Sequence, residues 1–169
     1  LIMNAFMMDD VAVWQQQVEK VLLRLQTDGS KVQKIGIFLA GSPIFFPNFK
    51  LYHLLEQAGM FVQADDLCSA ERAFPGAAVC EDTSRHGMLK ALAERYHRGC
   101  SCPTYADNER RVNTILRVTE QYGIKGVVFH VLKGCHPYDL ESFTLEKNQR
   151  KKGLKFLKIE TDYMKEDSQ

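Results

Sequence analysis

The sequence predicts an α/β domain of Rossmann-like or flavodoxin-like type, with three layers and a four-stranded parallel sheet, preceded by an N-terminal helix. Short apolar runs bounded by polar or turn residues are typical of buried strands, and helical patterns separate the runs along the chain. Parallel strands joined through helices have right-handed crossovers, which place helices on both faces of the sheet. The predicted strands cover residues 35–40, 61–64, 127–132 and 156–159.

The first segment of the chain has the pattern of an amphipathic helix. Apolar residues recur at steps of three and four between Val11 and Leu25, acidic residues precede them, and Gly29 follows. We therefore expect a linker helix within residues 1–30 and a C-terminal α/β domain over residues 31–169. The chain starts without an initiator Met and without the basic and small-residue parts of a signal peptide, so we expect a fragment of a longer subunit.

Four more helices are expected between and beside the strands. Asn48 is placed to cap a helix over residues 49–58, and Asp139 to cap a charged helix that ends near Gly153. Two further helical patterns, over residues 84–98 and 107–123, separate the second strand from the third.

Composition and charge exclude several classes of protein. The 169 residues are 45% hydrophobic and 25% charged, as in one globular domain, and the net charge of +1 gives no preference for nucleic acid or an acidic membrane. No apolar run approaches the roughly 20 residues that cross a bilayer. The glycine-rich dinucleotide and phosphate-loop fingerprints and the Gly-x-Ser-x-Gly motif are absent from the sequence. We therefore expect neither nucleic acid nor a membrane as a partner.

The cysteines indicate a reducing compartment. An odd number of thiols, without a secretion signal, argues against a disulfide framework, so we expect a cytoplasmic protein in which thiols pack, bind metal or react. They are Cys68, Cys80, Cys100, Cys102 and Cys135.

Ligands of open parallel sheets bind at the carboxyl ends of the strands. That rule selects residues 41–43, 65–68, 133–138 and 160–162, and it makes Cys68 and Cys135 better candidates than the other thiols. Ser42, in the first of these turns, could meet an anionic group.

Cys135 directly follows the clearest strand. Pro137 biases His136 away from helix, so an extended turn is expected around Cys135. A thiolate there could bind a soft metal or an iron–sulfur cluster, whereas the structural alternative is a small buried residue between strand and helix.

The remaining polar groups each have a structural and a functional interpretation. Asp66, beside Arg72, could form an ion pair that fixes the turn or could contact substrate. His130, inside an apolar strand, is expected to be a hydrogen-bonded core residue rather than a ligand. The basic run 147–152 is most simply a solvated helix face, although it could meet a phosphorylated cofactor. Cys100 and Cys102 are expected in a structural loop, with a zinc site as the alternative.

An ordered set of segments resembles the D-component family of 2-hydroxyacyl-CoA dehydratases, which includes 2-hydroxyglutaryl-CoA dehydratase and benzoyl-CoA reductase subunits. The segments span most of the chain from about residue 35 onward. They are Ala64 to Cys68 with Arg72, Arg95-Tyr96, Cys100 to Pro103, Gly126 to His130, Lys133 to Tyr138, and Ile159 to Tyr163.

The resemblance implies a cofactor and one of its ligands. In that family each subunit holds a 4Fe–4S cluster on three cysteines, two of them from an N-terminal domain. Cys135 matches the third ligand, so the cluster would be completed by ligands outside this chain. His136 stands where the family more often has an acid. Ser42, Asp66 and Arg72 would be edge residues that orient substrate or the neighbouring turns, and no catalytic residue is assigned.

The resemblance also implies a reaction and its partners. Water is removed, in syn or anti fashion, from a 2-hydroxyacyl-CoA through a ketyl radical anion, because the β-proton is otherwise too weakly acidic. The partners would be the acyl-CoA substrate, a paralogous second subunit, and an ATP-dependent activator that delivers the electron. We expect the fragment alone to be inactive.

Three alternatives remain at this point. The chain could belong to a benzoyl-CoA-reductase-like enzyme or another cluster-dependent reductase. It could be a cluster-free α/β module with an assembly role, or a small zinc-binding domain that uses Cys100 and Cys102.

Overall fold

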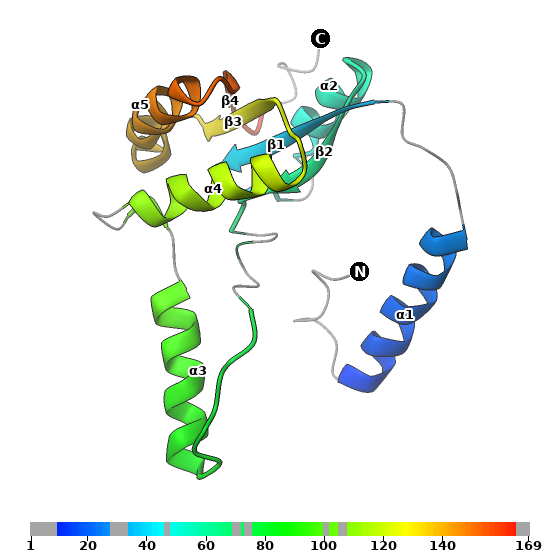
Figure 1. Ribbon diagram of the computed structural model, residues 1–169. Helices are drawn as coiled ribbons and strands as arrows, with labels where there is room; N and C mark the ends of the chain where they lie inside the picture. The colour runs from blue at the N-terminus through cyan, green and yellow to red at the C-terminus, as the bar shows by residue number, and fades with distance from the viewer. Residues whose placement is uncertain are drawn as a thin grey trace. The chain divides into compact units, whose positions relative to one another are not determined.

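The computed structural model describes residues 10–27, 34–45, 48–68, 72, 76–99, 102–104 and 108–164 (Figure 1). The chain forms two compact units, Leu1–Lys34 and Ile35–Gln169. In the first unit, helix α1 (Val11–Thr27) confirms the predicted N-terminal helix, and none of its residues is buried. Its role as a linker stays a prediction. The predicted domain boundary after residue 30 stays a prediction, because residues 28–33 lie outside the described part.

The second unit contains the predicted four-stranded parallel sheet, in the order β2-β1-β3-β4. Each strand lies where an apolar run predicts it, one to three residues longer than the run. The strands are β1 (Ile35–Gly41), β2 (Met60–Asp65), β3 (Gly126–Leu132) and β4 (Lys155–Thr161).

Helices cover both faces of the sheet and give the predicted three layers (Figure 1). Side chains alternate along β1, so Leu39 packs with Leu51 of α2 (Lys50–Gln57), while Phe38 faces the opposite side. That side is covered by α4 (Glu109–Gln121) through Ile115 and by α5 (His136–Lys151) through Leu145. Helix α3 (Arg85–Gly99) lies between β2 and α4 in the chain.

Two predicted helix caps are wrong. Asn48 does not cap α2, because its side-chain amide donates instead to the Asp162 carbonyl at 3.3 Å, and the N-cap position is Phe49. Asp139 does not cap α5, which begins three residues earlier and has Cys135 at its N-cap. The extended conformation predicted for His136 is also wrong, since proline is tolerated in a first helical turn, where the missing N–H has no partner to lose.

No helix in the described ranges is long and apolar enough to cross a membrane.

Candidate functional site

The carboxyl ends of the four strands meet at one edge of the sheet, as predicted. Ser42 follows β1, Asp66 follows β2, Cys135 lies beyond β3, and Asp162 follows β4. A hydroxyl group, two carboxylates and a thiol therefore follow the strand ends at this edge.

The turn after β1 requires glycine. Gly41 has φ +112°, and a Cβ at this position would lie 1.9 Å from the carbonyl oxygen of His130. The close approach lets the Ser42 N–H donate to the same carbonyl at 2.8 Å. The first edge turn is thereby fixed against β3.

His130 joins three strand ends. Its Nδ1–H donates to the Ser42 carbonyl at 3.0 Å, and its Nε2 accepts from the Thr161 hydroxyl at 2.8 Å, because a carbonyl can only accept. Burial lowers the pKa of His130, and the bond to Ser42 opposes that shift. The side chain is 1% exposed. This confirms the predicted hydrogen-bonded core histidine.

Ser42 is engaged inside the protein. Its hydroxyl accepts the N–H of Leu132 at 3.0 Å, and the residue is 1% exposed. The side chain therefore links the ends of β1 and β3. Its predicted contact with an anionic substrate group stays a prediction.

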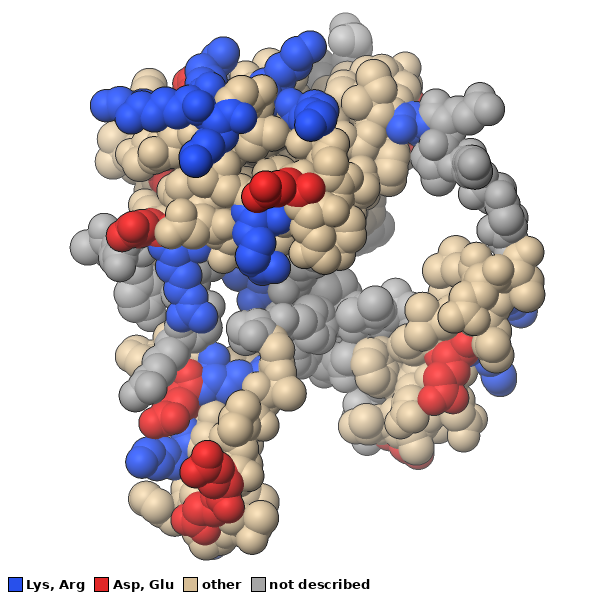
Figure 2. Space-filling model, viewed as in Figure 1, with Lys and Arg blue, Asp and Glu red and all other residues tan. Residues whose placement is uncertain are grey.

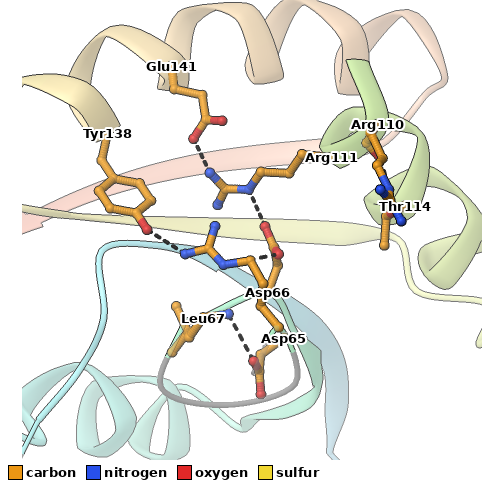
Figure 3. A network of polar contacts seen from close by, with 9 residues as sticks. Asp65, Asp66, Leu67, Arg110, Arg111, Thr114, Tyr138 and Glu141 are labelled. Carbon is orange, nitrogen blue, oxygen red and sulfur yellow. Dashed lines mark hydrogen bonds and ion pairs between the residues drawn. The ribbon is translucent and has the colours of Figure 1, made fainter. Parts of the chain in front are cut away.

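A buried ion-pair network lies beneath the edge on the side of α4 and α5 (Figure 3). Arg111 of α4, 1% exposed, donates from Nε to Asp66 and from Nη1 to Glu141 of α5. Arg111 thus bridges the end of β2 to α5. The sequence interpretation missed Arg111, although it shares the spacing of the buried residues Ile115 and Thr119 along α4.

Arg72 extends the network toward α5, and its pairing with Asp66 confirms the predicted local ion pair. Arg72 Nε lies 4.0 Å from Asp66 Oδ1, and Nη2 donates to the hydroxyl of Tyr138 at 2.6 Å (Figure 3). Burial raises the pKa of Tyr138 to about 12, against the opposing effect of Arg72. The phenol therefore stays protonated at neutral pH and can accept from Arg72 while keeping its own proton.

The network balances its positive and negative charges. Two guanidinium groups face two carboxylates, and burial raises the pKa of Asp66 and of Glu141, while Arg111 opposes both shifts. Nη2 of Arg111 and Oε1 of Glu141 are buried and have no hydrogen-bond partner among the described residues. Removing a single member would leave an uncompensated buried charge.

Cys135 stands at the junction of β3 and α5, half-buried against the core. Its N–H donates to the Leu132 carbonyl at 2.8 Å, and its own carbonyl accepts from the N–H of Asp139 at 3.0 Å. The backbone on both sides of the thiol is therefore fixed. Tyr138, the partner of Arg72, belongs to the same first turn of α5.

The thiols can be compared as metal ligands. Cys135 is a half-buried thiol at the carboxyl edge of the sheet and could act as one thiolate ligand, whereas Cys68 at the same edge is exposed. Among the described residues no three His, Cys, Asp or Glu side chains gather as a metal site. Cys102 receives a hydrogen bond from the Thr104 hydroxyl at 3.1 Å, and Cys100 lies outside the described residues. Cys135 could thus supply one ligand of a larger set.

The fold and the edge define a parallel α/β domain that presents a half-buried thiol above a buried ion-pair network. Residues 1–169 match the family described as 2-hydroxyglutaryl-CoA dehydratase, D-component, and the chain belongs to that family. It is 30% identical, over 133 residues, to the Escherichia coli (strain K12) protein named "Putative dehydratase subunit YjiM". The match covers 78% of this chain and 33% of that relative, so the chain spans about a third of its length.

Proposed function

We propose that this chain is the C-terminal domain of an iron–sulfur 2-hydroxyacyl-CoA dehydratase subunit, a lyase that removes water from its substrate within a larger complex. Membership of the D-component family supports the dehydratase assignment. The single observation that carries the proposal further is the position of Cys135, a half-buried thiol at the ligand-binding edge of the sheet.

The cofactor would be a 4Fe–4S cluster to which Cys135 contributes one thiolate, with the other ligands outside this chain. Such a cluster, when bound, supplies one-electron chemistry and a Lewis-acidic iron. The chain's own contribution is to hold the thiolate in place. The backbone hydrogen bonds to Leu132 and Asp139 fix the turn at the start of α5.

The substrate would be an acyl-CoA thioester at the same edge. Three residues at this edge have side chains that are largely buried and bound to other residues: Ser42, Asp66 and Arg72. Their proposed role is therefore to position the substrate indirectly, by holding the edge turns in place. The His130 bonds to Ser42 and Thr161 would keep the turns after β1 and β4 at a constant spacing.

The partners in this proposal are a paralogous second subunit and an ATP-dependent activator that supplies the electron. The domain alone would be inactive. A cytoplasmic location would keep its thiols reduced and available as ligands.

Anaerobic iron and acid-labile sulfide analysis of the full-length native polypeptide tests the proposal, with Cys135→Ala beside a Cys80→Ala control. Cys80 is exposed, and its thiol donates to the carbonyl of Asp82 at 3.0 Å. We expect iron and sulfide in the parent and the control and a clear loss in Cys135→Ala. Equal iron in all three proteins would remove Cys135 from the site. Zinc in place of iron, or no metal, would refute the cluster and favour a zinc-binding or an assembly domain.

A further inference from the structure

A groove separates α4 from α5 and continues to the amino end of the sheet. Its first part, a hollow of about 500 Å³, lies between two stripes of side chains: α4 supplies Val112 and Asn113, and α5 supplies Asn148 and Lys151. The second part, about 360 Å³, lies beside the start of β3, where Lys125 and Lys152 line it. Leu116 and Lys152 line both parts, so the two hollows are continuous. We call them together the amino-edge groove.

Lysines surround the amino-edge groove. Lys155 adjoins Lys125, because its N–H donates to the Lys125 carbonyl at 3.0 Å, and Lys147 precedes Lys151 by one helical turn. In the space-filling view, Lys and Arg side chains gather over the region of α5 (Figure 2). All five are exposed: Lys125, Lys147, Lys151, Lys152 and Lys155.

These five lysines have no ion-pair partner among the described residues, unlike cations elsewhere in the unit. Lys158 pairs with Asp139, and Arg150 pairs with Glu146 at 2.8 Å. The carboxylates that line the groove are Glu109 and Glu120. Of the five lysines, Lys125, Lys151 and Lys152 line the groove, which against the two glutamates leaves an excess of one positive charge in its lining. Lys147 and Lys155 add positive charge close to these residues in the chain.

We propose that the amino-edge groove binds a ligand with two or more linked phosphate groups. Lysine ammonium groups at the open end would contact the phosphates, and the amides of Asn113 and Asn148 would supply hydrogen bonds. The apolar floor of Val112 and Leu116 can hold a flat or aliphatic part of the ligand. The size of the groove lies in the range of small-molecule sites, which is roughly 300–1,000 Å³.

This site is separate from the proposed cluster site. Its second part lies beside the amino end of β3, whereas Cys135 lies beyond the carboxyl end of that strand. A strand of seven residues rises about 3.3 Å per residue, so this part of the groove is roughly 20 Å from Cys135. Binding here can therefore fail or succeed without any change at Cys135.

The structural alternative is that the lysines compensate helix dipoles. Helices α4 and α5 both end at this edge, and cations near a helix C-terminus stabilise it by about 0.3–1 kcal/mol. That effect accounts for Lys151 in the last turn of α5. It accounts less well for Lys125 and Lys155, which stand at the starts of strands.

Isothermal titration of the full-length polypeptide with tripolyphosphate, ATP and coenzyme A tests the proposal. The first variant is Lys151→Glu with Lys152→Glu, and the second is Lys125→Gln with Lys155→Gln. The control, Lys20→Glu with Lys90→Glu, reverses two exposed charges in α1 and α3. We expect each groove variant to weaken binding tenfold or more and the control to bind like the parent. Added salt should weaken binding, because the contacts are exposed.

The titration distinguishes ligand binding in the groove from a purely structural role of the lysines. Binding that both groove variants weaken supports the proposal. If the binding lost in these variants is tighter for ATP or coenzyme A than for tripolyphosphate, the ligand is a nucleotide, and if it is equal for all three probes, the polyphosphate alone is recognised. No binding of all three probes would overturn it. Binding that persists in both variants, with lowered melting temperature only, would show that the lysines act on helix stability, and would also overturn it.

Discussion

Arg72 donates a 2.6 Å hydrogen bond to the Tyr138 hydroxyl and so joins the segment after β2 to the first turn of α5. Tyr138 is 6% exposed, and Arg72 also lies 4.0 Å from Asp66. One guanidinium therefore connects a buried carboxylate to the turn that presents Cys135.

Tyr138→Phe tests this connection. The ring keeps its packing against Phe129, but the Arg72 guanidinium loses an acceptor in a largely buried place. We expect the free energy of unfolding to fall by about 1–3 kcal/mol, measured by urea denaturation. Tyr122→Phe, at a side chain that is 52% exposed, is the control and should change stability little. Equal effects of the two substitutions would show that the Arg72 bond contributes nothing.

Arg111→Met tests the buried ion-pair network. The substitution removes the cation that Asp66 and Glu141 share, and leaves two buried carboxylates with one remaining guanidinium of the network, that of Arg72. We expect a loss of about 3–5 kcal/mol in the free energy of unfolding. Arg117→Met, at an exposed position on the same helix, is the matched control.

A double variant distinguishes charge from packing. Replacing Glu141 by Gln beside Arg111→Met removes one charge of each sign and leaves the Asp66 carboxylate with Arg72, so part of the stability should return. A double variant as unstable as Arg111→Met alone would show instead that the loss comes from the shape of the buried side chain.

The sequence predicts the sheet better than it predicts the network. Each strand is a short apolar run, and such a run is typical of a strand in a parallel sheet that is buried on both faces. Arg111 follows another arginine in a charged segment, and only the packing of α4 against β3 decides which of the two is buried. A tertiary contact made across 45 residues, between Arg111 and Asp66, leaves no local signal.

The start of α5 shows a second limit. Pro137 predicts an extended residue before it, yet the same proline fits the first turn of a helix. Local preference therefore favours two conformations at His136, and the docking of Tyr138 into the core selects the helical one. The position of Cys135 beyond the carboxyl end of β3 was still predicted, because it depends on the strand and not on the helix start.

The stability of the domain should fall in mildly acidic solution because of His130. Burial lowers the pKa of His130 below its ordinary value of 6.5 in the folded chain. Between that lowered value and 6.5 the unfolded chain binds more protons, so stability is complete above pH 6.5 and decreases as the pH falls. Urea unfolding at several pH values, for the parent and for His130→Gln, should show a smaller pH slope in the variant. His53→Gln, at an exposed histidine, should keep the parental slope, and identical slopes in all three proteins would contradict the prediction.

Gly41→Ala should disrupt the edge more than an alanine at any open glycine turn. Alanine at φ +112° is strained, and its Cβ would also meet the His130 carbonyl at 1.9 Å, so the turn after β1 must separate from β3. Gly59→Ala, at φ +72° with no atom within 4 Å of the added Cβ, has backbone strain alone and should lose about 1–2 kcal/mol. We expect the Gly41 variant to lose clearly more stability and, in the full-length polypeptide, to retain less iron, because Ser42 and His130 would no longer hold the turns together. Equal losses of stability in the two variants would show that the contact between Gly41 and His130 does not constrain the edge.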